Sequence, residues 1–378
     1  MMQWSPQQNE ALSKAAAWLR MRYSPTFYLA GYAGTGKSTL ALHMAREENG
    51  KVCFAAFTGK AARVMRSKGC VGARTIHSMI YKVQTDADGK TVRDGDGNPL
   101  LELNTRALDG ASLVIIDEVS MVNAELANDL LSFGVPVLVL GDPAQLPPVK
   151  GEGFFTGRRP DYMLTDVHRQ AKESPIIRLA TDIREGGSYG HPMELDGLTV
   201  CRKADLDPGR VTSADIVIVG RNETRQKYNV RLRELKGFDN PNPMVGENLI
   251  CLRNDRDKRI SNGEIYKVVA KKRSGKHRGA RVLNYTLADA DSPERPEIDV
   301  KVRPEFFRPD NSANDIDWKQ LAETQRFTFG LAITAHKAQG SQWSDVCVFD
   351  ESHAFREDRA RWLYTAVTRA ALNLTLVI

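Results

Sequence analysis

A glycine-rich segment near the start of the chain has the residue types and spacing that bind a polyphosphate. Residues 31–38 read GYAGTGKS and fit the pattern G-x-x-x-x-G-K-[ST], between a strand and a helix that the flanking residues predict. Glycines let backbone N–H groups wrap the phosphates, and the following helix presents its positive end. Lys37 should reach the β- and γ-phosphates, and Ser38 should bind Mg²⁺. The expected nucleotide contacts in this segment are Gly31, Gly34, Thr35, Gly36, Lys37, Ser38 and Thr39.

An apolar run that ends in two acidic residues is the second chemical signal. Residues 113–118 read LVIIDE, which is the pattern of a buried strand followed by a carboxylate pair. Asp117 is expected to hold Mg²⁺, usually through water, and Glu118 to orient and deprotonate the attacking water. A glycine-rich phosphate loop followed by this pair predicts a nucleoside triphosphatase, without saying what the hydrolysis is used for.

Polar residues follow two further expected strands. Residues 141–148 read GDPAQLPP, and ligands bind at the carboxyl ends of strands in open parallel α/β sheets, so Gln145 is placed to sense the γ-phosphate. Residues 56–62 read AFTGKAA, in which Thr58 and Lys60 suit contacts with a phosphate backbone at the start of a helix. Thr75 and His77 continue the same edge.

The elements that must position these residues alternate between strand and helix. Short strands are expected at 26–30 and 52–57, each followed by a helical pattern, at 38–48 and 60–67. The runs at 113–116 and 135–140 are continuous and rich in Val, Ile and Leu, which is typical of strands buried on both faces of a parallel sheet. The first two-fifths of the chain therefore predict a doubly wound α/β layer.

Two segments interrupt this alternation. Residues 83–104 are polar and glycine-rich and predict an inserted hairpin or loop. A second α/β pattern starts near residue 166, with strands expected at 216–219, 346–349 and 374–378. Between them, residues 237–325 show short β-like segments at 248–252, 265–269 and 281–286 and no helical period, which predicts a small all-β insertion. Residues 288–317 are acidic, contain proline and are poorly patterned.

The charge of the chain is concentrated in the expected β insertion. The net charge is +6, but residues 253–281 hold eleven Lys or Arg against three acidic residues, a local excess of +8. A basic patch of this kind is the footprint of a polyanion binder, and a solvated hairpin kept soluble by lysine is the alternative. The segment 271–278, KKRSGKHR, reads as an exposed turn.

Composition excludes several other classes. The chain has 42% hydrophobic and 26% charged residues, which is ordinary globular usage, and its apolar runs are far shorter than a membrane span. The start, MMQWSPQQNE, lacks a basic region and an apolar stretch, so no signal peptide is expected. Five scattered cysteines without C-x-x-C argue against a disulfide framework and a zinc site. These features predict a cytoplasmic protein, and its compact size suits a phage, plasmid or bacterial enzyme.

Taken in order, the motifs resemble those of the RecD/Dda-like branch of superfamily 1 DNA helicases. They are SPQQ (5–8), GYAGTGKST (31–39), FTGKAA (57–62), TIHSM (75–79), IIDEVSM (115–121), GDPAQLPPV (141–149), LTDVHRQ (164–170), TAHKAQGSQW (334–343) and YTAVTRA (364–370). The resemblance runs from residue 5 to the last expected strand, and DEVSM and TAHKAQGSQ favour this branch over the Rep/UvrD one.

The resemblance implies roles for further residues. Gln8 resembles the glutamine that reads the adenine edge, and Arg169 and Arg369 resemble the two arginines that the second domain supplies to the γ-phosphate. Gly340 is expected at the nucleotide as well. The implied single-strand DNA contacts are Thr58, Lys60, Thr75 and His77 on the first domain, and Thr334, His336 and Lys337 on the second. ATP and Mg²⁺ are the implied cofactors, single-stranded and forked DNA the implied partners, and the implied enzyme acts as a monomer that moves 5′→3′.

The implied architecture is a pair of RecA-like P-loop domains with parallel sheets. We expect the first at 1–165, with a pin-like insertion at 83–104, and the second at 166–378, with an SH3-like β insertion at 237–325. The family's separate N-terminal domain is not expected, because the phosphate loop lies within forty residues of the start. The pin-like insertion has no aromatic residue after Tyr81, so an ATPase that translocates and remodels protein–DNA complexes with little unwinding is the alternative activity.

Overall fold

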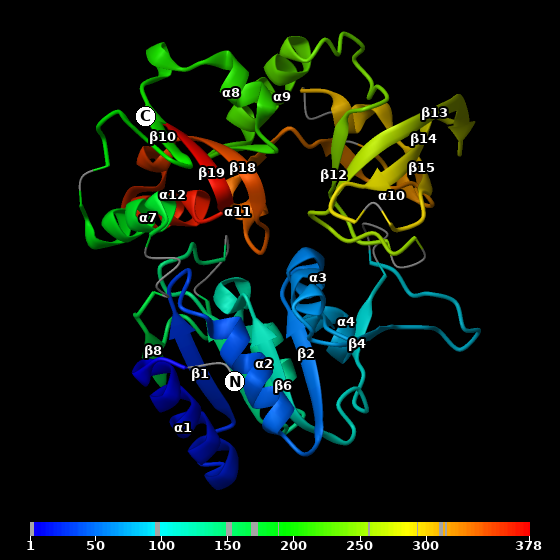
Figure 1. Cartoon of the computed structure of the whole chain (residues 1–378). Coiled ribbons are helices and arrows are strands. Elements are labelled where there is room, and N and C mark those ends of the chain that lie inside the picture. The colour runs from blue at the N-terminus through cyan, green and yellow to red at the C-terminus, as the bar shows by residue number, and fades with distance from the viewer. Residues whose placement is uncertain are drawn as a thin grey trace.

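The computed structural model describes residues 4–94, 99–148, 153–167, 173–187, 189–255, 258–292, 294–309, 313 and 316–378. Figure 1 shows a lower half built from the first part of the chain and an upper half built from the rest, with a small β-rich body beside the upper sheet. No helix among these described residues is both long and apolar enough to cross a membrane.

The lower half is a parallel sheet covered by helices. Its strand order is β3-β2-β6-β7-β1-β8, and each neighbouring pair runs parallel. The strands are β1 (Thr26–Gly31), β2 (Lys51–Ala56), β3 (Arg74–Thr75), β6 (Ala111–Asp117), β7 (Val137–Gly141) and β8 (Tyr162–Leu164). The helices are α1 (Pro6–Met21), α2 (Lys37–Glu47), α3 (Gly59–Ser67), α4 (Ile76–Ile80) and α5 (Ala124–Leu131), with a 3₁₀ turn η1 (Val119–Met121). Strand β7 is buried along its whole length and β6 over residues 113–116, as their continuous apolar runs predicted, and β1 is also buried throughout.

A thin arm leaves the lower half between α4 and β6. Strand β4 (Tyr81–Val83) pairs antiparallel with β5 (Leu101–Leu103), and further bridges join Thr85 to Thr91 and Arg93 to Pro99. Figure 1 shows the arm projecting away from the body of the protein. It occupies the segment where the sequence predicted an inserted hairpin.

The upper half repeats the architecture of the lower half. Its strand order is β17-β11-β18-β19-β10-β9, parallel except for the antiparallel pair β10 and β9. The strands are β9 (Met193–Leu195), β10 (Leu198–Cys201), β11 (Ile216–Val219), β17 (Ala332–Thr334), β18 (Trp343–Phe349) and β19 (Ala370–Val377). The helices are α7 (Pro175–Glu185), α8 (Pro208–Ser213), α9 (Asn222–Leu235), α11 (Ala335–Ala338) and α12 (Arg359–Val367), with 3₁₀ turns η2 (Lys203–Asp205) and η5 (Ser352–Asp358).

The β-rich body is an antiparallel sheet inserted between β11 and β17, which we call the β insertion. Its strand order is β15-β14-β13-β12-β16. The elements are β12 (Asn248–Cys251), β13 (Ile265–His277), β14 (Ala280–Asp289), β15 (Ile298–Val302), β16 (Phe327–Phe329), α10 (Trp318–Leu321) and the 3₁₀ turn η3 (Pro304–Phe307). The sheet has a core of its own, which includes the buried rings of Tyr266, Tyr285 and Phe327.

The prediction of an exposed turn at 271–278 is wrong. Residues 271–277 belong to strand β13, which ends at His277 and pairs with β14 on both sides of a register shift. A register shift between Lys272 and Gly275 accommodates Ser274 within the strand. The chain reverses only at Arg278 and Gly279, whose φ angles of 50° and 81° are those of a tight left-handed turn. The glycine that suggested a turn therefore marks a bulge.

Candidate functional site: a nucleotide cleft between two sheets

The phosphate loop connects β1 to α2 and faces the upper half. Gly34 and Gly36 have φ angles of 79° and 83°, a backbone region in which an ordinary side chain is strained. The Lys37 ammonium lies across the loop and donates to the carbonyl oxygens of Gly31 at 2.6 Å and Tyr32 at 3.0 Å. The loop is thus formed around the lysine that the sequence predicted to meet the phosphates.

Ser38 and Asp117 meet at the bottom of this loop. The Ser38 hydroxyl donates to Asp117 Oδ2 at 2.9 Å, and Asp117 Oδ1 accepts the backbone N–H of Glu118 at 2.8 Å. A hydroxyl and a carboxylate are hard oxygen ligands of the kind that Mg²⁺ prefers. The residues fit the predicted metal, which Ser38 and Asp117 would hold. There, Mg²⁺ would neutralise charge on the β- and γ-phosphates.

Glu118 follows β6 and lines the same cleft as Lys37. Desolvation in the cleft raises the pKa of its carboxyl, and the nearby Arg369 opposes this shift. The carboxylates of Asp117 and Asp142 raise the pKa further, while Lys37 lowers it. A carboxylate with a raised pKa is a better proton acceptor, which suits the predicted role of general base.

Residues of the upper half complete the cleft. Arg369 is 4% exposed and is held by the carbonyl oxygens of Thr365 at 3.0 Å and Ser341 at 3.2 Å. Gly340 and Arg369 line the cleft together with Gln145 of the lower half. The Gln145 Oε1 atom is buried and has no hydrogen-bond partner among the described residues, so it is available to a ligand in the cleft.

Gln8 and Arg169 were also predicted to contact the nucleotide. Gln8 is buried beside the phosphate loop, and its amide donates to the Thr35 carbonyl at 3.3 Å. Its Oε1 also accepts the Ser5 backbone N–H at 3.1 Å, which completes the capping box of α1. Arg169 lies outside the described residues.

Three of the predicted DNA-contact residues share one structural position. Thr58, Thr75 and Thr334 are the N-cap residues of α3, α4 and α11, and the hydroxyl of each accepts a backbone N–H three residues later. These helices follow β2, β3 and β17, so the threonines lie at the carboxyl ends of parallel strands. The sequence identified the threonines but not their common capping role.

The predicted DNA-contact residues with basic or aromatic character are partly engaged within the protein. The His77 ring lies between those of Phe57 and Tyr81, with centroids 6.0 and 5.8 Å away. Burial lowers the pKa of His336 and of Lys337, and Lys337 Nζ donates to Asn262 Oδ1 of the β insertion at 3.2 Å.

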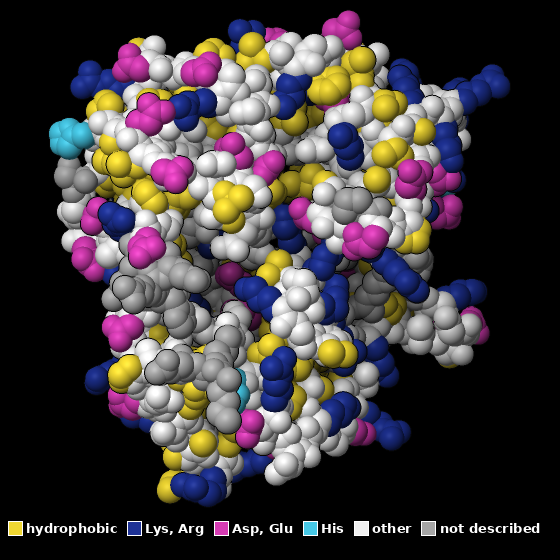
Figure 2. Space-filling model, viewed as in Figure 1, with side chains coloured by type: hydrophobic (Ala, Val, Ile, Leu, Met, Phe, Trp, Pro, Cys, Tyr) yellow, Lys and Arg dark blue, Asp and Glu magenta, His cyan; other side chains and the backbone are white. Residues whose placement is uncertain are grey.

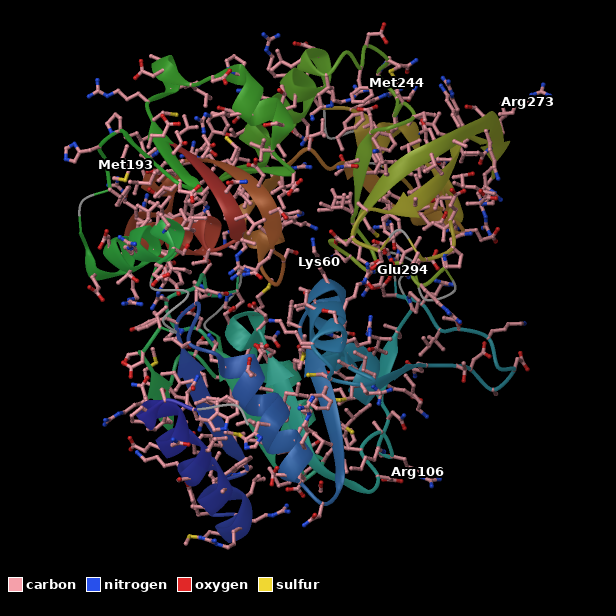
Figure 3. The ribbon with its side chains drawn as sticks, viewed as in Figure 1. Lys60, Arg106, Met193, Met244, Arg273 and Glu294 are labelled. Carbon is pink, nitrogen blue, oxygen red and sulfur yellow. The ribbon has the colours of Figure 1, made fainter. Side chains whose placement is uncertain are left out.

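Lys60 of α3 is covered by the β insertion. Its side chain is 7% exposed, its ammonium lies 3.0 Å from Asp291 Oδ2, and it sits 4.1 Å from the centre of the Trp343 ring. Figure 3 shows Lys60 at the start of α3, pointing toward the upper half. Desolvation lowers the pKa of Lys60, and Asp291 opposes that shift. The residue predicted to bind a DNA phosphate is therefore paired with a carboxylate here.

The contact around Lys60 extends along α3 as a buried ion network. Arg63 binds Asp289 at 2.6 Å and also pairs with Glu264, and both carboxylates are almost fully buried. Arg295 binds the same Asp289 oxygen at 2.5 Å. At the start of α3, a Cβ placed on Gly59 would lie 2.3 Å from Ser261, so only glycine allows this approach. We call this contact the α3 interface.

The basic cluster of β13 lies at the far end of the β insertion. Figure 3 places Arg273 at the outer tip of the hairpin, on the side away from Lys60. Lys272 pairs with Asp299 at 2.6 Å and Arg278 with Glu323 at 2.9 Å. Lys271, Arg273 and Lys276 are exposed and form no ion pair with another described residue. Figure 2 shows further Lys and Arg side chains near the boundary between the two halves.

Sequence reasoning missed the contacts that join the halves across the cleft. Tyr364 of α12 bonds to Ala33 and Asp142, and the Arg184 guanidinium of α7 lies 3.5 Å from the centre of the Tyr32 ring. Ala33 and Tyr364 are 331 positions apart, and no spacing or composition signal connects them. Only the fold brings these residues together.

A phosphate loop, an acidic pair and an arginine from a second sheet define the class of this protein: a P-loop nucleoside triphosphatase fold of two RecA-like domains. Residues 3–196 match the sequence profile described as AAA domain, and residues 329–377 match that of the UvrD-like helicase C-terminal domain. Because the first match covers more than half of the chain, the chain belongs to the AAA-domain family.

Curated relatives and solved structures agree with the motifs. The chain is 29% identical over 381 residues to an ATP-dependent RecD2 DNA helicase of Deinococcus radiodurans, covering 90% of this chain and 45% of that protein. It is 25% identical over 392 residues to an ATP-dependent DNA helicase Pif1 of Bdellovibrio bacteriovorus, covering 90% and 81%. The chain thus spans less than half of the RecD2 relative. The predicted resemblance to the RecD branch of superfamily 1 is confirmed.

The fold is shared with solved Pif1 structures. Bacteroides Pif1 bound to ssDNA is similar with a TM-score of 0.61 and 18% identity, over 100% of this chain and 93% of that one. A structure of two coordinating Pif1 helicases at forked dsDNA gives a TM-score of 0.60 and the same identity, over 100% and 92%. The predicted α/β fold with two RecA-like domains is confirmed by this likeness.

Proposed function

We propose that the chain is an ATP-dependent DNA helicase that translocates 5′→3′ on single-stranded DNA and unwinds forked duplexes. The observation that carries the proposal is the cleft in which Lys37 and Glu118 of one sheet face Arg369 of the other. The relatives named as RecD2 and Pif1 helicases support the same activity.

The residues of the cleft divide the chemistry between the two domains. Lys37 and the loop amides bind the β- and γ-phosphates, and Glu118 accepts the proton of the attacking water. Arg369 approaches from the second domain, and we propose that Arg169 does too, so that hydrolysis depends on cleft closure. A delocalised guanidinium stabilises the charge that spreads over the γ-oxygens in the transition state. Gln145 connects the γ-phosphate to the loop after β7.

The DNA strand is proposed to lie across the carboxyl ends of both sheets. Thr58 and Thr75 lie at the carboxyl end of one sheet and Thr334 at that of the other, each at the start of a helix, and hydroxyls and helix-start N–H groups are among the groups that contact phosphates. Alternate closing and opening of the cleft changes the separation of these two contact sets and moves the protein along the strand. We place the boundary between the domains near residue 165, after β8.

The test is unwinding of fluorescently labelled forked duplexes that carry a single-stranded tail at either the 5′ or the 3′ end. We expect ATP-dependent strand separation with the 5′ tail only. Glu118→Gln should bind ATP and DNA and separate nothing, and Lys37→Ala should not hydrolyse ATP. Unwinding from the 3′ tail would refute the polarity, and near wild-type hydrolysis by Glu118→Gln would refute its assignment as the base.

The arm formed by β4 and β5 favours a second candidate activity, translocation on DNA with little unwinding. Its aromatic residue, Tyr81, is fixed at the base of the arm, where its hydroxyl bonds to Asp129 of α5. The described residues farther out, 84–94 and 99–100, contain no aromatic side chain to wedge between bases. An ssDNA-stimulated translocase that remodels protein–DNA complexes would hydrolyse ATP rapidly on single strands with little strand separation per ATP, and measuring that ratio separates the two activities.

A further inference from the structure

The hydroxyl of Tyr364 makes hydrogen bonds that cross the nucleotide cleft. It accepts the backbone N–H of Ala33, in the phosphate loop, at 2.9 Å. It donates to Asp142 Oδ2, in the loop after β7, at 2.7 Å. The hydroxyl is thus satisfied as both acceptor and donor, and it joins two loops of the first domain to α12 of the second.

We propose that Tyr364 is a positioning residue that locks the phosphate loop, the loop after β7 and helix α12 into the geometry in which Arg369 reaches the γ-phosphate. This inference rests on the proposed ATP hydrolysis. Tyr364 and Arg369 belong to one continuous segment, the end of α12 and the turn after it. A hydroxyl anchored on the phosphate loop therefore fixes where the arginine five residues later enters the cleft.

The Tyr364–Asp142 bond has the properties of a strong contact. Both side chains are buried, at 2% and 4% exposed. Burial and the adjacent carboxylate raise the pKa of Tyr364 well above its ordinary value, so the phenol stays protonated and keeps donating. Hydrogen bonds to a charged group are stronger than those between neutral groups. Without Tyr364, Asp142 Oδ2 would lose this donor, while Oδ1 would keep the backbone N–H of Ala144 at 3.0 Å.

Neighbouring contacts hold the loop after β7 against the second domain. The Thr365 hydroxyl accepts the backbone N–H of Leu146 at 2.9 Å, and Gln339 Nε2 donates to the Leu146 carbonyl at 2.8 Å. Leu146 directly follows Gln145, so the second domain holds the backbone next to the residue that is proposed to sense the γ-phosphate. The Tyr364 bond differs from these because it alone, among the hydrogen bonds of the described residues, links the phosphate loop with the loop after β7 through one atom.

The experiment compares Tyr364→Phe with Tyr228→Phe in steady-state ATP hydrolysis at saturating single-stranded DNA. Tyr228 is a half-buried tyrosine of α9 outside the cleft, with its ring packed on Phe349. We expect Tyr364→Phe to lower kcat by about tenfold to a hundredfold, in line with one lost hydrogen bond to a charged group. The KM for ATP should stay within about twofold, because the ring and the phosphate-binding amides remain. Tyr228→Phe should retain the wild-type kcat.

A double variant separates positioning from general packing. In an Asp142→Ala background, Tyr364→Phe should cost less than in the wild type, because the acceptor of the Tyr364 hydroxyl is already gone and only the bond from the Ala33 N–H is left to lose. Thr365→Val should give the same pattern as Tyr364→Phe, a lower kcat at unchanged KM, to a smaller extent. A wild-type kcat in Tyr364→Phe, or equal losses in both backgrounds, would overturn the proposal. Absence of DNA-stimulated hydrolysis in the wild type would overturn the proposed function instead.

Discussion

Releasing Lys60 from Asp291 should strengthen the binding of single-stranded DNA. In the α3 interface, Asp291 occupies the ammonium that the motif FTGKAA assigns to a DNA phosphate, so DNA must displace a carboxylate to reach it. At 3.0 Å and an effective dielectric constant of about 20, the gross attraction of the pair is about 5.5 kcal/mol. Desolvation of the buried ammonium opposes most of this, which leaves a net contribution of about 1–2 kcal/mol. Asp291→Asn should therefore raise DNA affinity about fivefold to thirtyfold.

The assay is fluorescence anisotropy with a labelled oligonucleotide at one fixed salt concentration. Asp299→Asn is the matched control, because it removes the same charge from the same β insertion but frees Lys272 from an exposed pair. Adding Lys60→Ala to Asp291→Asn should abolish the gain. If both aspartate variants bind equally well, only net charge matters and Asp291 does not compete with DNA for Lys60. Weaker binding by Asp291→Asn would mean that the pair builds the DNA surface rather than blocking it.

Further predictions concern the cleft and the basic hairpin. Arg369→Ala should lower ATP turnover by roughly 10³–10⁵ with little loss of ATP affinity; unchanged turnover with a lower melting temperature would assign the arginine a structural role. Burial raises the pKa of Glu118, so as pH falls its carboxylate is protonated, and lost as a base, at a higher pH than an exposed glutamate would be. The acid limb of the kcat–pH profile should therefore lie at a higher pH than for an exposed glutamate. This limb should vanish with Glu118→Gln. Replacing Lys271, Arg273 and Lys276 with serine should flatten the salt dependence of DNA affinity by about 0.7 log units per lost phosphate contact; an unchanged slope would show that the hairpin is only solvated.

The sequence predicted the parts of the fold whose burial is continuous. Strand β11 was predicted with its observed bounds, because four consecutive apolar residues fill a position buried on both faces. Strands β8 and β15 were not predicted. The first has only three residues, and the second alternates between buried and exposed residues within an acidic, proline-containing segment. The extent of β13 was missed because a bulge and a turn have the same glycine signal.

The candidate site also contains residues that the sequence could predict and residues that it could not. Residues such as Lys37 and Asp117 lie in local motifs of fixed spacing, so the sequence alone singles them out as candidates. Tyr364 and Asp291 act through partners far away in the chain, and their residue types are common in ordinary proteins. Sequence also does not reveal that Lys60 is covered, because burial of a lysine depends on which surface packs against its helix.

The strand order of the upper sheet has a consequence for synthesis on the ribosome. Strand β19 lies between β18 and β10, yet it is made after both, so the two strands have no direct pairing until it is added. The first sheet contains only strands made before residue 165 and can close early, while the second domain must wait for its last-made interior strand. Until then the apolar faces of β10 and β18 stay open to chaperones and to other chains. A chain cut before Ala370 would lack this bridging strand, so β18 and β10 would have no strand to join them in one sheet.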